Sequence, residues 1–160
     1  MAKKKNFVVW QGLVIALAVV LAVLGGGYYY SSHAVESQVP GNMYSYTSIS
    51  KEKTIFVAFS PTTNRAVVDT DQSVVAKAHA SREDFNKAYV KQAKAKHAWQ
   101  YKTEGNTVTL AQISGDTVSQ WQYNGILATP NHLYARGFSY QISKAGQGKV
   151  NKWVTFTKIN

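Results

Sequence analysis

The sequence contains no cysteine. This absence excludes disulfide bonds, thiol nucleophiles and thiolate metal sites, and it excludes a lipoprotein attached through a cysteine thioether. Any folded region of the chain must therefore be held together by core packing alone. No internal repeat is present, and the chain length leaves room for a single folded domain beside an anchoring segment.

Acidic residues are scarce. The sequence has eight acidic and 18 basic residues, which gives a formal net charge of +10. Three of these positive charges belong to Lys3, Lys4 and Lys5, which leaves +7 for the rest of the chain. Such an excess would attract anionic wall polymer, lipid headgroups or nucleic acid. The alternative is ordinary surface charge that keeps a protein soluble, since the basic residues are spread from Lys51 to Lys158.

Sequence motifs for catalysis and metal binding are also missing. The chain has no His-Glu-x-x-His motif and no Gly-x-Ser-x-Gly elbow. The close pair Asp69 and Asp71 fits a turn or a helix cap better than a calcium or glycosidase site. Residues 144–149 lack the Gly-Lys-Ser/Thr ending of a phosphate loop and indicate a hairpin turn. We therefore predict no enzyme activity, no cofactor and no metal. We interpret the histidines as surface residues: His33, His79, His97 and His132.

One long uncharged run, from Phe7 to Leu24, dominates the N-terminal part of the chain. As a helix this run reaches about 27 Å, close to the thickness of the hydrocarbon core of a bilayer, about 30 Å. Lysines precede the run and no basic side chain of lysine or arginine follows before Lys51, which predicts a cytoplasmic N-terminus and an exported remainder. We expect a basic tail over 1–6, a transmembrane signal-anchor helix over 7–27 and a stalk over 28–40.

A cleavable secretory signal is an alternative interpretation of the same segment. Ser32-His33-Ala34 has the small-x-small pattern of a cleavage site, and cleavage there would release a secreted form. The apolar run is longer than the 7–15 residues usual in such signals, however. Aromatic residues near both ends, Trp10 and Tyr28–Tyr30, are typical of a membrane-spanning helix. We therefore favour an uncleaved single-pass anchor in the plasma membrane, with the C-terminal domain outside the cell.

Residues 41–160 are expected to form a domain rich in β-structure. Short alternating segments are separated by turn signals such as Asn124-Gly125. A helix is expected from about Arg82 to His97, because Ser81 can cap its start and because apolar residues recur at helical spacing. Residues 71–80 could extend this helix or end a strand. Strands are expected at 43–50, 54–59, 65–70, 99–103, 107–113, 117–123, 126–128, 133–142 and 150–159. The predicted class is α+β, with a mainly antiparallel sheet that forms a curled sheet, a barrel or a sandwich around one packed helix near 82–97.

Two groups of residues are candidates for binding. The first is a basic patch on and after the predicted helix, suited to a polyanion. It consists of Lys87, Lys91, Lys94, Lys96 and Lys102. The second is an aromatic face on the predicted sheet, which could line a pocket for an apolar ligand or could simply fill the core. It consists of Trp99, Tyr101, Trp121, Tyr123, Tyr134, Phe138, Tyr140 and Trp153.

The basic start, the single anchor and the cysteine-free domain rich in Tyr and Thr resemble small uncharacterised membrane-anchored extracytoplasmic proteins of Gram-positive bacteria. This resemblance concerns architecture alone and carries over no functional residue. We predict a non-catalytic binding or interaction module of the cell envelope, which contacts the bilayer through 7–27 and an anionic wall polymer or another envelope protein through its domain. Nucleic acid is not expected outside the cell. The alternatives are a small apolar-ligand carrier with an aromatic-lined β-barrel pocket, and an enzyme whose histidine meets a carboxylate or serine in a cleft.

Overall fold

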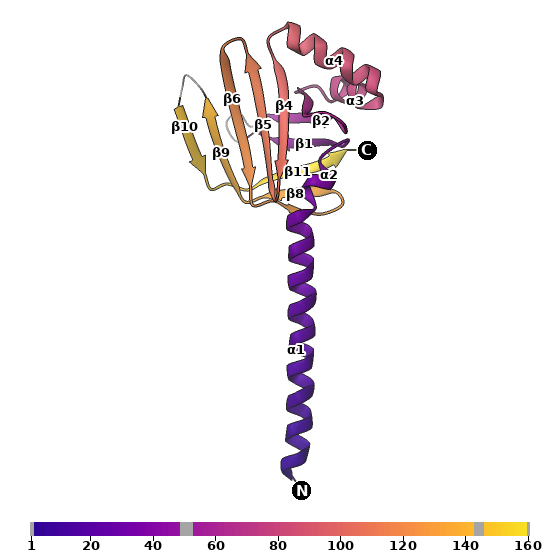
Figure 1. The fold of residues 1–160 in the computed structure, drawn as a ribbon, viewed down its shortest axis with the longest axis vertical. Helices are drawn as coiled ribbons and strands as arrows, with labels where there is room; N and C mark the ends of the chain where they lie inside the picture. The colour runs from indigo at the N-terminus through magenta and orange to yellow at the C-terminus, as the bar shows by residue number, and fades with distance from the viewer. Residues whose placement is uncertain (1, 49–52, 143–145, 160) are drawn as a thin grey trace.

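The computed structural model describes residues 2–48, 53–142 and 146–159, with side chains along the first helix from Leu17 onward. Helix α1 (Ala2–His33) is 32 residues long and stands away from the rest of the protein (Figure 1). The large side chains of α1 between Leu17 and Tyr30 are each more than half exposed. Within the described residues, no helix combines the length and the apolar character needed to cross a membrane.

The junction between α1 and the domain differs from the predicted stalk over 28–40. Helix α1 runs through His33, and a short helix α2 (Val35–Gln38) follows directly. Val35 and Val39 are fully buried in the main core. The sequence interpretation relied on the absence of a steady hydrophobic period, but one turn of helix is enough to place these two apolar side chains on one buried face. Residues 34–39 are thus part of the folded domain instead of a linker.

The strands form one antiparallel sheet, which confirms the α+β class. Its eleven described strands follow the order β10-β9-β6-β5-β4-β3-β2-β1-β11-β8-β7. The bounds are β1 (Met43–Thr47), β2 (Thr54–Phe59), β3 (Arg65–Asp69), β4 (Ala98–Glu104), β5 (Thr107–Ser114), β6 (Thr117–Asn124), β7 (Leu127–Ala128), β8 (His132–Ala135), β9 (Gly137–Ile142), β10 (Gly146–Val150) and β11 (Val154–Ile159). The last two residues of the expected strand 43–50 lie in the segment 49–52, outside the described residues.

The sheet curls so that its two halves cross and enclose the main core. In Figure 1, β4, β5, β6, β9 and β10 run along the direction of α1, whereas β1, β2, β8 and β11 run across it. Aromatic rings join the halves: Tyr46 of β1 and Phe156 of β11 lie 5.6 and 4.8 Å from Tyr123 of β6. Because β10 and β7 are the two edges of the described sheet, the observed form is the open curled sheet among the three expected shapes.

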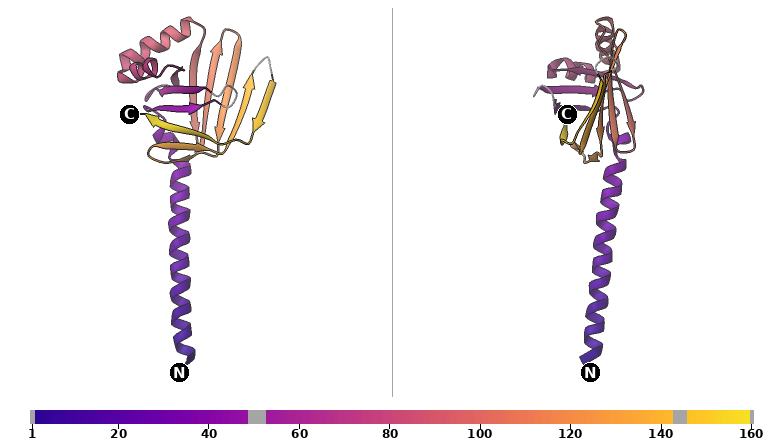
Figure 2. Two further views of the ribbon diagram at one scale, coloured as in Figure 1. Left: turned by 180° about the vertical axis from the view of Figure 1, so that it is seen from behind. Right: turned by 90° about the vertical axis from the view of Figure 1, so that its left-hand side faces the viewer.

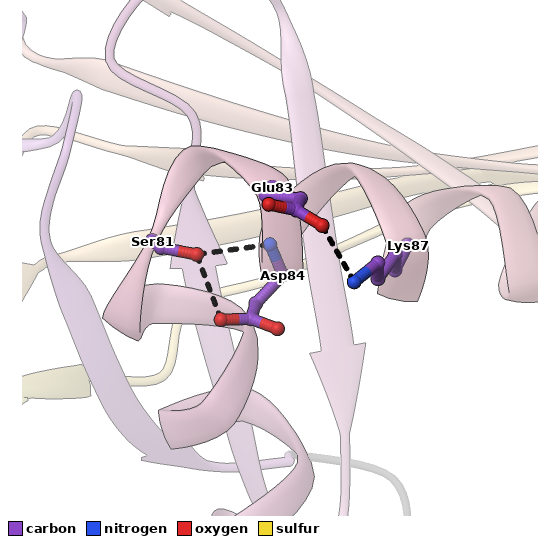
Figure 3. Close-up of polar contacts among 4 residues, drawn as sticks. All are labelled: Ser81, Glu83, Asp84 and Lys87. Atoms are coloured by element: carbon purple, nitrogen blue, oxygen red, sulfur yellow. Dashed lines mark hydrogen bonds and ion pairs between the residues drawn. The ribbon is translucent and has the colours of Figure 1, made fainter.

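Helices α3 (Gln72–Ala80) and α4 (Arg82–Lys94) form a second layer on the outer face of β1, β2 and β3. They enclose a smaller core that contains Ala58, Val67, Val75 and Phe85. The predicted start of the second helix is confirmed, because the Ser81 hydroxyl accepts a hydrogen bond from the backbone N–H of Asp84 at 3.0 Å (Figure 3).

The helical region differs from the prediction in two respects. Helix α4 ends at Lys94 instead of His97, and Lys96 beyond it has a positive φ of 59°, a conformation that cannot continue a right-handed helix. Residues 71–80, whose structure the sequence left open, form the separate helix α3, which Asp71 caps by accepting a hydrogen bond from the N–H of Ser73 at 2.8 Å.

The C-terminal strands also differ from the prediction. The expected strand 133–142 is divided at Arg136, whose N–H bonds the Asn124 carbonyl, so that β8 pairs with β11 and β9 pairs with β6. The expected turn 144–149 contributes most of strand β10, while residues 143–145 lie outside the described chain. The ring of Tyr140 lies over Gly148, where a Cβ atom would come within 2.6 Å of it. Glycine therefore occurs here because the neighbouring ring needs the space.

Alkaline pH should weaken the fold through Tyr46. Burial raises the pKa of Tyr46 to about 12, whereas an unfolded tyrosine titrates near 10. The stabilisation is complete below pH 10 and is lost as the pH rises toward about 12, because only the unfolded chain ionises easily. From pH 9 to pH 11 we expect a loss of about 1.4 kcal/mol in the free energy of unfolding from this residue, absent in Tyr46→Phe. Denaturant titrations of both proteins at the two pH values measure it, and equal losses in both would contradict it.

Candidate functional site

The predicted basic patch is only partly continuous. Lys87, Lys91 and Lys94 recur at helical spacing on α4, and each is exposed. Lys87 is paired with Glu83 at 2.7 Å (Figure 3). Lys102 is separate from the helix, because it lies on β4 and is paired with Glu104 at 2.6 Å. Its position also explains why the pKa of Glu104 is lowered, since the ammonium group donates a hydrogen bond to that carboxylate.

The predicted aromatic face divides into three environments. Tyr101, Tyr123 and Phe138 are buried in the main core, and Trp99 and Trp121 pack against it with ring centroids 5.2 Å apart. Tyr134 stacks on His132 outside this group, while Tyr140 and Trp153 are exposed.

The buried aromatic residues contact other rings instead of lining an open space. Phe59 lies 4.8 Å from Tyr101, and Tyr46 lies 4.5 Å from Phe156. The Tyr101 hydroxyl donates a hydrogen bond to the Ser60 carbonyl at 2.7 Å. This packing indicates a filled aromatic core at the place where the carrier hypothesis requires a pocket.

A cleft lies instead between the α3–α4 junction and the turn that joins β2 to β3. This cleft has a volume of about 370 Å³, which is in the range of small-ligand sites. Its apolar lining includes Phe59, Pro61 and Phe85. Its polar lining consists of Ser60, Thr62, Thr63, Arg65, His79, Ser81, Arg82 and Asn86.

Hydrogen bonds fix the strand side of the cleft. The buried Ser60 hydroxyl accepts hydrogen bonds from the N–H and the hydroxyl of Thr63, at 3.2 and 2.8 Å. Gly41 packs so closely on Pro61 that a Cβ atom at Gly41 would lie 3.2 Å from the Pro61 Cβ, and its φ of 74° also favours glycine. These contacts therefore hold the strand side of the cleft in place without a ligand.

Positive charge gathers at the cleft. Arg65 and Arg82 both line it, and in the described part of the chain neither is in an ion pair with a carboxylate. The Arg65 guanidinium lies over the Tyr89 ring, 4.7 Å from its centroid, which orients it without neutralising it. The His79 Nε2 donates a hydrogen bond to the Gly41 carbonyl at 3.1 Å and so joins α3 to the opposite wall. An apolar floor beside guanidinium groups can hold an anionic group.

A second hollow, of about 480 Å³, brings together one residue from each predicted group. Lys91 of α4 and Trp99 of β4 both line it, together with Gln92. Gln92 donates a hydrogen bond from its side-chain nitrogen to the Val68 carbonyl at 2.8 Å, and its buried side-chain oxygen has no hydrogen-bond partner among the described residues. The two predicted groups therefore meet here, at the C-terminal end of α4, and also on the sheet, where Lys102 and Tyr140 line another hollow.

Sequence reasoning missed the cleft because Arg65 and Arg82 lie on different elements. Only the packing of the α3–α4 pair on the sheet brings them together, and neither occurs in a motif. Among the residues with described positions, no three His, Asp or Glu side chains lie close enough to hold a metal ion. A scan of protein-family models, a search of curated proteins and a search of solved structures each found no match to this chain.

Proposed function

We propose that this protein is a single-pass, membrane-anchored module of the cell envelope that binds an anionic polymer outside the cell. The anchor is supported by the uncharged run from Phe7 to Leu24, by the lysines before it and by the exposed apolar side chains of α1. The apolar side chains of α1 from Leu17 to Leu24 are left uncovered by the described residues, which favours an apolar surrounding, and the length of the uncharged run is close to that of a bilayer core.

The observation that carries the binding proposal is the placement of unpaired cations on the layer farthest from α1. Figures 1 and 2 show α3 and α4 at the end of the domain opposite to the place where α1 joins it. Arg82, Lys91 and Lys94 lie along α4, and among the described residues none of them forms an ion pair. Arg82, in the first turn, lines the cleft, whereas Lys91 and Lys94 lie near the other end of α4 and on another side of it, so that a flexible polymer with repeated negative charges meets cations at both ends of the helix.

The junction at α2 favours the uncleaved form over a secreted one. The candidate cleavage site, Ser32-His33-Ala34, lies where α1 enters the domain, and Ser32 and Ala34 are buried there. Cleavage after Ala34 would remove these side chains and the hydrogen bond from the Ser31 hydroxyl to the Ala128 carbonyl. The proposed module acts by binding, without a chemical step.

Reversing the charge on α4 should weaken polymer binding. In the triple variant Arg82→Glu, Lys91→Glu and Lys94→Glu, we expect the affinity of the full chain in nanodiscs for immobilised poly(glycerol phosphate) to fall about 100-fold. This follows from about 1 kcal/mol for each basic residue near an anionic surface. Wild-type retention should also decrease as the salt concentration rises.

The matched control changes the net charge equally at other places. Lys53→Glu, Lys149→Glu and Lys158→Glu reverse three charges that lie outside α4. We expect this control to lose much less affinity than the α4 variant. Equal losses in both triple variants would show that binding depends on net charge and not on α4. Salt-insensitive retention of the wild type would refute the polyanion proposal.

A further inference from the structure

The membrane-proximal end of the domain has no free linker between it and helix α1. The Ser31 hydroxyl donates a hydrogen bond to the Ala128 carbonyl of β7 at 2.7 Å, and Ser32 is buried. Glu36 of α2 accepts a hydrogen bond from the N–H of Gly105 at 2.8 Å. The domain and α1 therefore move as one body, and the tilt of α1 in the bilayer is left for contacts at the membrane surface to set.

The length of α1 places this end of the domain at the depth of the lipid headgroups. If residues 7–27 cross the hydrocarbon core, Ser31 lies about 6 Å beyond it, and a headgroup layer is about 5–7 Å thick. The three tyrosines just before Ser31, Tyr28–Tyr30, are 54–71% exposed. Exposed amphipathic rings at this depth are typical of the membrane interface.

The same end of the domain presents a further exposed aromatic residue, Trp153. The β10–β11 connection and the β8–β9 connection both lie at the end from which α1 leaves (Figures 1 and 2). The β10–β11 connection carries Lys152 and Trp153, and Trp153 is 61% exposed. The Arg136 guanidinium lies over the Trp153 ring at 5.7 Å, and the Arg136 stem packs near Gly125, where a Cβ atom would be 3.5 Å away.

The charges at this end favour anionic lipid. Arg136 and Lys152 form no ion pair with any described carboxylate. The nearby carboxylates are already engaged, because Glu104 pairs with Lys102 and Glu36 bonds Gly105. A tryptophan flanked by cations suits the boundary between headgroups and acyl chains, where the ring is desolvated and the cations meet phosphates.

We infer that the domain rests on the outer surface of the bilayer through Trp153, Arg136 and Lys152, which hold it in one orientation with α4 facing away from the lipid. The inference rests on the proposed anchor, which supplies the depth. The surface that these three residues contact is that of an anionic phospholipid bilayer. This contact keeps the basic helix α4 at the greatest distance from the membrane.

The absence of cysteine makes a direct test simple. The full chain is incorporated into nanodiscs that contain phosphatidylglycerol. One sample carries a fluorophore on Asn151→Cys, close to Trp153, and the other carries it on Asp116→Cys, in the turn between β5 and β6. Lipids with a spin label on the headgroup should quench the label at position 151 and leave the label at 116 unquenched. Adding Trp153→Ala and Arg136→Ala should abolish the quenching at 151, and these exposed changes should leave the fold intact.

The outcomes separate the two proposals. Equal quenching at positions 151 and 116, or quenching at 151 that persists in the double alanine variant, would overturn the surface contact while the anchor stands. Failure of the chain to enter nanodiscs, measured by flotation, would overturn the anchor and with it the contact. A loss of quenching in neutral phosphatidylcholine nanodiscs alone would support the role of the two cations.

Discussion

Replacing Leu17 and Leu21 with lysine is expected to release the protein from membranes. Both side chains are 61% exposed on α1, so that no packing within the described structure depends on them. Each lysine near the centre of a spanning helix costs about 3–4 kcal/mol relative to leucine, and the pair costs about 6–8 kcal/mol. The fraction of protein that resists carbonate extraction should therefore fall from nearly all to little.

The control for this prediction is Leu17→Val with Leu21→Val, which keeps the segment apolar and should remain in the membrane fraction. External protease should digest the domain of the control in intact cells and spare its N-terminal tail. If wild-type protein were found in the soluble fraction of the cytoplasm, or if the lysine variant resisted extraction, the anchor proposal would be refuted.

Phe156→Ala is expected to cause the largest loss of stability in the domain. Phe156 is almost fully buried, and its ring contacts both Tyr46 and Tyr123, so that it joins the two halves of the curled sheet. Removing a buried phenylalanine costs about 3–5 kcal/mol through lost burial and the cavity that remains. Because whole domains have only about 5–15 kcal/mol of stability, we expect a large decrease in the midpoint of denaturant unfolding.

The neighbouring exposed residue gives the matched control. Thr155 precedes Phe156 on β11 and faces solvent, so Thr155→Ala should change stability by less than about 1 kcal/mol. A Phe156→Ala protein that unfolds at the wild-type denaturant concentration would show that the interface between the halves does not hold the fold together.

Local signals in the sequence predicted local structure well. The start of α4 follows from Ser81, whose hydroxyl caps the helix as expected, and the compact run Thr54–Phe59 forms β2 with the predicted bounds. Strand β6 also ends at the Asn124-Gly125 signal, with Gly125 at a φ of 62°, but the hairpin expected there is wrong, because β6 pairs with β5 and β9 whereas β7 pairs with β8. These features depend on neighbouring residues, and hydrogen bonds within a few residues decide them.

Features that depend on distant pairing were not predictable in the same way. The division of 133–142 into β8 and β9 arises because one part pairs with β11 and the other with β6. The burial of Val35 and Val39 depends on a core that later strands build, and the cleft needs Arg65 and Arg82 to be brought together across two layers. Alternation within one segment carries no information about such partners.

The sheet order has a consequence for the timing of folding. Strand β11, the last of the described strands, lies between β1 and β8 and pairs with β1, the first of them. The β1–β11 ladder therefore cannot close until residues 154–159 have left the ribosome and, for an exported domain, the translocation channel. Until then, β1 and β8 each have an edge without its partner strand. A chain truncated before Val154 should therefore remain a substrate for chaperones and quality-control proteases.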